Sequence, residues 1–142
     1  FKSKNETISI PMAKFTEIPS GFLLSKIRIP LENWDISSFV KLGPTKGMND
    51  NSASFTFLAS TQKNLLSDIR IAFCGLFSLR SKEIENLIIG SRLPLQQRSI
   101  DIVLDNAEIL FDENAKLIEK TLNPILKEQY LNLIRYNLSL LS

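Results

Sequence analysis

The spacing of apolar residues in this 142-residue chain changes near Gly75. Before that point, Ser54–Phe57 and Asp68–Phe73 alternate at period two, as half-buried β-strands do. After it, apolar residues recur every three or four positions, as they do in amphipathic helices. Strands followed by helices predict an α+β fold, in which an antiparallel sheet of three to four strands is followed by three helices packed on it.

Two further strands are expected upstream of this pair. The apolar run Phe22–Ile29 alternates at its end and stops at Pro30, because proline cannot donate to a strand ladder. Ile36–Leu42 predicts the next strand, and Gln62–Asn64 is expected to connect the later pair as a hairpin. One buried face of the sheet would then be lined by Phe55, Phe57, Ile69, Ile71 and Phe73.

A short helix is expected directly after the strands. Ser81 can cap its first turn, because a serine hydroxyl accepts from an otherwise unpaired backbone N–H. Gly90 can end it in a left-handed conformation. Its buried side would carry Ile84, Leu87 and Ile88.

Two longer amphipathic helices follow. Asn123 and Pro124 predict the cap and the first position of the last one. The apolar stripe of the middle helix consists of Ile100, Val103, Leu104, Ala107, Leu110 and Phe111. The stripe of the last helix consists of Tyr130, Leu131, Ile134, Leu138 and Leu141.

Composition excludes several function classes. The chain has no histidine, which removes Ser-His-Asp and Cys-His catalysis and most zinc sites. The net charge of +2 is too small to favour nucleic acid or an anionic membrane as a partner. No run of about 18 apolar residues predicts a membrane span. We therefore expect a globular domain with neither catalytic residues nor a metal site.

Three features could be mistaken for reactive groups. Cys74 is expected to be a buried structural thiol, because the chain has no histidine to activate it. Trp34 and Phe39 are expected to pack in the core or in an interface. An acidic row on the middle helix is expected to be a solvated face, because hard cations need oxygens converging from several directions. That row consists of Asp101, Asp105, Glu108 and Asp112.

The segment Gly43–Asn51 is expected to be a surface loop. It holds two glycines, a proline, two asparagines and an aspartate, it follows Lys41, and it contains Lys46. Glycines allow the backbone to approach a ligand closely. The spacing is neither that of a phosphate loop nor that of a dinucleotide fingerprint. From composition alone, a loop without a ligand and a loop that contacts one both remain open.

Four segments, in order along the chain, resemble one known family. Phe22–Pro30 resembles the "ELL-x-x-I-x-IP" strand of the flavoprotein subunits of molybdenum hydroxylases, and Ser38–Gly43 resembles their next strand, which carries a lysine before a loop. Asp68–Gly75 resembles their "IRIA-x-GG" strand, and Arg80–Gly90 resembles the "R-x-x-x-x-E-x-x-L-x-G" helix that follows. These subunits are the medium subunits of xanthine dehydrogenase, carbon monoxide dehydrogenase and related enzymes.

The resemblance implies the C-terminal domain of an FAD-binding subunit, with an antiparallel sheet and three helices. Residues 1–20 would be the tail of the preceding FAD domain or a linker, and residues 21–142 the C-terminal domain. Because the chain opens with Phe1 and not methionine, we expect it to be part of a longer product.

The resemblance also implies the residues that meet the cofactor. Leu24 matches a leucine that touches the flavin, and Lys41 matches the lysine at the flavin. Gly43, Lys46 and Asp50 fall in the loop 42–51, which in the family controls access of an electron acceptor to the ring. An ammonium near a flavin stabilises the negative charge that the reduced ring gains.

By resemblance, the intact enzyme is a cytoplasmic, xanthine dehydrogenase-like oxidoreductase. Electrons would pass from iron–sulfur clusters through FAD to an acceptor, with the iron–sulfur and molybdopterin subunits as partners. This chain alone would be inactive and would hold FAD weakly, and it is compatible with a homo-oligomer. Pro44, Thr45 and Lys46 stand where many members carry arginines, and Cys74 stands where many carry a second glycine. The acceptor therefore stays open among NAD, a ferredoxin and a quinone.

A second hypothesis is a non-catalytic interaction or dimerisation domain with no redox role. The strand-rich half and the amphipathic helices are equally compatible with it. The coding sequence upstream of Phe1 discriminates the two, because a glycine-rich FAD domain there would select the flavoprotein.

Overall fold

The computed structural model describes residues 1–44, 47, 49, 51–118 and 123–142. The chain divides into two compact units, Phe1–Glu32 and Asn33–Ser142. The boundary expected at residue 20 therefore lies inside the first unit.

The first unit has little regular structure. It contains one short 3-10 helix, Met12–Lys14, and the isolated bridges of Lys2 with Thr7 and with Leu23. The strand expected over Phe22–Ile29 is wrong, since only Leu23 of that segment pairs, and only as an isolated bridge. Period-two alternation is necessary for a half-buried strand, but a strand also needs a partner ladder for its backbone groups.

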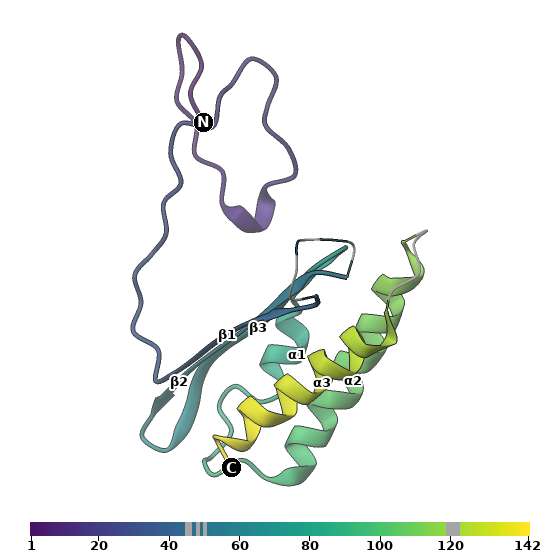
Figure 1. Ribbon diagram of the computed structural model, residues 1–142. Coiled ribbons are helices and arrows are strands. Elements are labelled where there is room, and N and C mark those ends of the chain that lie inside the picture. The colour runs from purple at the N-terminus through teal and green to yellow at the C-terminus, as the bar shows by residue number, and fades with distance from the viewer. Residues whose placement is uncertain (45–46, 48, 50, 119–122) are drawn as a thin grey trace. The chain divides into compact units, whose positions relative to one another are not determined.

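The second unit opens with an antiparallel meander, shown in Figure 1. Its strands are β1 (Ile36–Leu42), β2 (Ala53–Gln62), β3 (Leu65–Cys74) and β4 (Ser78–Leu79), paired in the order β1-β2-β3-β4. The expected hairpin between β2 and β3 is confirmed. Lys63 and Asn64 form its turn with φ of 52° and 59°, which is the backbone that a tight hairpin with a right-handed twist requires.

Three helices follow among the described residues: α1 (Lys82–Asn86), α2 (Gln97–Lys116) and α3 (Pro124–Ser139). The caps are as expected, because the Ser81 hydroxyl accepts from Ile84 N and the Asn123 side chain accepts from Ile125 N. Gly90 has φ of +83° but lies beyond the end of α1. The expected burial of Leu87 is wrong, since α1 ends at Asn86 and the turn that follows points Leu87 to solvent.

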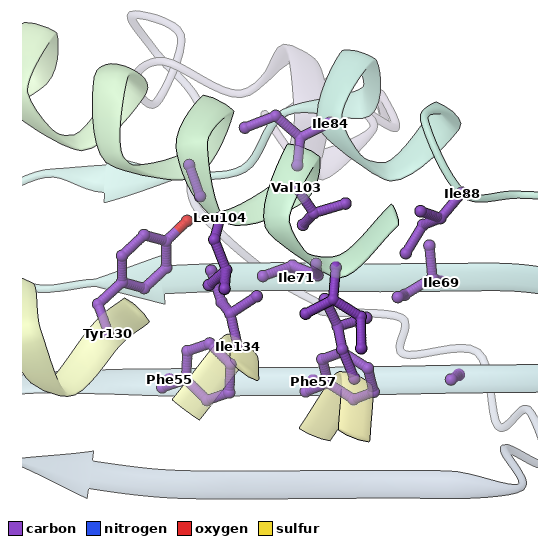
Figure 2. Close-up of a cluster of buried hydrophobic side chains, with 14 of the residues drawn as sticks. Phe55, Phe57, Ile69, Ile71, Ile84, Ile88, Val103, Leu104, Tyr130 and Ile134 are labelled. Atoms are coloured by element: carbon purple, nitrogen blue, oxygen red, sulfur yellow. The ribbon is translucent and has the colours of Figure 1, made fainter. Parts of the chain in front are cut away.

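The helices cover one face of the sheet, and the core lies between the two layers (Figures 1 and 2). Phe55, Phe57, Ile69, Ile71 and Phe73 all point into that core, as the alternation predicts. The α+β class, with an antiparallel sheet followed by three helices, is therefore confirmed. No helix among the described residues is long and apolar enough to cross a membrane.

Candidate functional site

Lys41 lies on the face of the sheet opposite the helices. It pairs in register with Ser54, and residues paired across strands share a face. Phe55, the neighbour of Ser54, points into the core, so Ser54 and Lys41 point the other way. We call this side the outer face. The Lys41 side chain is exposed there.

Small side chains surround Lys41 on the outer face. Its row continues through Ser54 to Cys74 on β3 and Ser78 on β4. In the neighbouring row Phe39 is 63% exposed, so an aromatic ring stands beside the lysine on an otherwise low surface. That neighbouring row consists of Phe39, Thr56 and Ala72.

One expectation about packing fails on this face, and another is narrowed. Cys74 is exposed, with its Sγ 3.6 Å from the Ser78 hydroxyl, because Phe73 takes the core side and the next residue must point outward. Phe39 is outside the core for the same reason, since Val40 takes the inner side, so its packing in an interface stays a prediction. The outward direction of both side chains follows from the alternation of side chains along each strand.

Trp34 lies half-buried against Arg70. The Arg70 guanidinium carbon is 5.7 Å from the centroid of the indole ring, which is a cation–π contact. Arg70 also forms an ion pair with Asp68, two residues earlier on β3. The sequence gives no signal for this contact, because Trp34 and Arg70 are brought together only by the register of the sheet.

Asp35 immediately precedes β1 and is held by β2. Its Oδ2 accepts hydrogen bonds from Thr61 N at 2.6 Å and from the Thr61 hydroxyl at 3.0 Å. These bonds favour the ionised carboxylate and lower the pKa of Asp35. The negative charge of the Asp35 carboxylate therefore lies at one end of β1, and the positive charge of Lys41 lies near the other end.

Gly43 is the first residue of the loop that follows β1. Its φ is +106°, and a Cβ there would collide with the carbonyl oxygen of Asn51. The other end of the loop is held by local bonds, from Asn49 N to Ser52 Oγ at 2.9 Å and from Asn51 N to Asn49 Oδ1 at 2.8 Å. Gly43 thus has a structural reason to be glycine that does not involve a ligand.

A shallow pocket of about 270 Å³ lies between this loop and the start of α3. It combines side-chain amides with an apolar wall from α3. Its described lining consists of Gly43, Pro44, Asn49, Asn51, Asn123, Ile125, Leu126 and Gln129.

The other expected site residues lie elsewhere. Leu24 belongs to the first unit, where it is half exposed and lines a hollow of about 440 Å³. Lys46 and Asp50 lie outside the described residues. Of the five expected cofactor contacts, Lys41 and Gly43 are therefore the pair that the second unit brings together, at the end of β1.

Glu85 is a buried carboxylate that the sequence analysis did not single out. It is 2% exposed, and its Oε1 accepts from the backbone N–H of Ile71 at 3.0 Å. Arg80 donates to both carboxylate oxygens, at 2.9 and 3.0 Å. The arginine and glutamate of the "R-x-x-x-x-E" pattern thus bind each other and the edge of β3, which is a structural role.

The acidic row of α2 is not gathered around one point. Asp101 accepts from Gln97, whereas Glu108 and Asp112 both bind Lys127 of α3, at 2.9 and 2.7 Å. The row lies on a solvated face as expected, with Asp101, Asp105 and Glu108 exposed, and Glu108 and Asp112 in addition join α2 to α3.

A scan against models of known protein families finds no match for this chain, and a search of curated proteins finds none either. What the site can do is therefore argued from its residues.

Proposed function

We propose that this chain is the flavin-covering C-terminal domain of the FAD subunit of a molybdenum hydroxylase of the xanthine dehydrogenase type. The observation that carries the proposal is the position of Lys41. It is exposed on the outer face, directly before the loop that Gly43 begins. From Ile36 onward, the strands and helices also come in the order that the resemblance implies, although the strand that it implies over Phe22–Pro30 is absent from this described segment.

The outer face suits a flat ring. Apart from the exposed ring of Phe39, the side chains in the row of Lys41 and in the neighbouring row are serine, cysteine, threonine and alanine, so a planar group can approach the sheet over them. When bound, FAD accepts two electrons and passes them to an acceptor. Lys41 would supply a positive charge beside the ring.

Partners follow from the same proposal. The chain would work in one assembly with an iron–sulfur subunit and a molybdopterin subunit, and its activity would belong to that assembly. No residue of this chain is assigned a covalent or proton-transfer step, so its contribution is to shape the flavin pocket and to set its charge.

Replacing Lys41 with methionine in the intact FAD subunit tests the proposal. Loss of the cation should lower the two-electron potential of the flavin by roughly 20–45 mV, which corresponds to about 1–2 kcal/mol. The readout is the potential from an anaerobic dye titration, together with the rate of electron transfer to the acceptor. Lys82→Met, at an exposed position on α1, is the matched control and should change neither. An unchanged potential in Lys41→Met contradicts the role given to this lysine.

A non-catalytic interaction domain is the second candidate. It is favoured by the exposure of the Phe39 ring on the outer face, since exposed aromatic side chains are common in interfaces. On that hypothesis Lys41→Met would leave every redox property of its assembly unchanged, whereas Phe39→Ser would weaken association with the partner.

A further inference from the structure

We propose that two copies of this chain associate side by side through the free edge of β1 and the adjoining flank of α3. The inference does not depend on the flavin role, because it rests on the strand edge and on α3 and shares only Lys41 with the face proposed for the flavin. The α3 flank is defined here as Ile125, Leu133, Tyr136 and Leu140.

The edge of β1 is available for pairing. Within Asn33–Ser142, β1 is one of the two edge strands of the sheet, and no described strand pairs with its second edge. The strand has seven residues, contains no proline, and pairs with β2 without a register shift. Natural edge strands are usually protected by proline, bulges or several charges. Lys41 is the only charged residue in β1.

The α3 flank is a second apolar stripe, separate from the one that faces the core. Tyr136 is 61% exposed and Leu140 is 52% exposed, at positions eleven and fifteen residues after the half-exposed Ile125. At 100° per residue these positions fall on one side of the helix. Lys127, which reaches α2, lies on the opposite side, so the flank points away from α2.

The flank borders the edge of β1. Ile125 and Gln129 line the same pocket as Gly43, which follows directly after β1. Helix α3 lies over β1 and β2 and packs on both. Its 16 residues span about 24 Å and the seven residues of β1 span about 23 Å, so the two elements match in length.

A second copy fits this surface better than an unrelated partner does. If two β1 strands pair antiparallel, the two sheets become continuous at the usual spacing of about 4.8 Å. Because α3 lies over β1 and β2, the two α3 helices would then lie about two strand spacings apart, roughly 10 Å. That is the distance at which helices pack, so each flank would meet its own copy.

The charges of Lys41 in β1 and of Asp35, directly before β1, are self-complementary in one register. With Ser38 opposite Ser38 of the partner subunit, Lys41 lies opposite Asp35 of the partner subunit, and the reciprocal pair forms as well. Both side chains are on the outer face of the sheet, three residues on either side of Ser38. The same register places Ile36 opposite the partner's Val40 on the inner face.

Sedimentation velocity on the full 142-residue chain, from about 1 to 100 µM, tests the proposal. We expect a concentration-dependent dimer. Tyr136→Lys and Leu140→Lys should each raise the dimer Kd by about tenfold or more, because each buries a charge in the flank contact. Ile109→Lys on α2, where the isoleucine is 58% exposed, is the matched control and should leave the Kd unchanged.

Charge exchange tests the register. Asp35→Lys and Lys41→Asp should each weaken the dimer, and the double variant should restore most of the affinity. Asp35→Lys also removes the bonds to Thr61, so circular dichroism must show that each variant is folded.

A chain that stays monomeric over the whole range overturns the proposal, whether the edge is solvated or covered by Phe1–Glu32. If the two flank variants and the control variant change the dimer Kd equally, the proposal is also overturned. A dimer that the double variant fails to restore overturns the register. A dimer combined with an unchanged flavin potential in Lys41→Met would contradict the proposed function and leave this inference standing.

Discussion

Glu85 joins the sheet to the segment that follows it. Ile71 lies on β3 where the two-residue strand β4 no longer covers the edge, so its N–H would otherwise lack a strand partner. The Glu85 carboxylate takes that N–H and is itself balanced by Arg80. A buried charge is tolerated here because each of its oxygens is hydrogen-bonded.

Glu85→Ala should lower the free energy of unfolding by about 2–3 kcal/mol, because it leaves the Ile71 N–H unpaired in a buried position. Arg80 is 40% exposed in its side chain and can return to water, which keeps the loss below that of a fully buried pair. Urea unfolding measures the effect. Glu113→Ala, at an exposed site on α2, should change stability by less than about 0.5 kcal/mol. Equal losses in both variants would contradict the role assigned to Glu85.

The alternation of side chains along a strand predicts on which face of the sheet each residue lies. The absence of an activating histidine favours a buried, structural Cys74. The residue instead points outward, because it directly follows the inward-facing Phe73. The same parity places Lys41 on the outer face. By contrast, nothing in the local sequence predicts that Glu85 is buried, because its partners lie 5 and 14 residues away and converge only in the folded chain.

Helices α2 and α3 are joined by both polar and aromatic contacts. Lys127 of α3 binds Glu108 and Asp112 of α2. Tyr130 of α3 packs its ring against Phe111 of α2, with ring centroids 5.4 Å apart, and against Phe73 of β3 at 5.5 Å. Burial raises the pKa of Tyr130, and the two carboxylates raise the pKa of Lys127.

These two shifts predict a loss of stability in alkali. Both folded-state pKa values lie above their ordinary values, so the folded chain binds these protons more tightly than the unfolded chain does. The resulting stability is fully present below about pH 10 and is lost as the pH rises through the folded values. Urea unfolding at about pH 7.5 and about pH 10.5 measures the fall.

The variant Tyr130→Phe separates the two contributions. It removes the tyrosine part and should make the alkaline fall shallower, while Lys127→Met removes the other part. Stability that is independent of pH over this range would contradict both assignments. A fall that is unchanged in Tyr130→Phe would contradict the assignment to the tyrosine.

The elements that were predicted correctly have partners close by in sequence. Strands β2 and β3 form a hairpin, and the capped starts of α1 and α3 depend on residues within three positions. The strand expected over Phe22–Ile29 failed because alternation predicts which side a residue would face, not whether a neighbouring strand exists to pair with it.

At the scale of the whole molecule, the chain is proposed to cover one side of a cofactor without holding its diphosphate. The second unit would contribute its outer face, with Lys41, and the loop that begins at Gly43. Tight binding of a dinucleotide usually depends on backbone N–H groups at a glycine-rich turn and a helix start. The resemblance places those groups in a separate domain.

The 142-residue chain mixed with FAD should therefore stay colourless after gel filtration, and the spectrum of the mixture should equal that of free FAD. The intact subunit, treated in the same way, should remain yellow and serves as the control. A stoichiometric yellow complex of the short chain would contradict this division between domains.

The sequence by itself determined the α+β class, the hairpin, the caps and the inward set of the sheet. Each of these follows from periodicity or from contacts a few residues apart, which act before the chain has folded. Only the tertiary structure decided that Gly43 packs against Asn51 and that Glu85 binds the edge of β3. These depend on groups that meet only when distant segments converge, because the energy of each contact is set by burial and geometry and not by residue type alone.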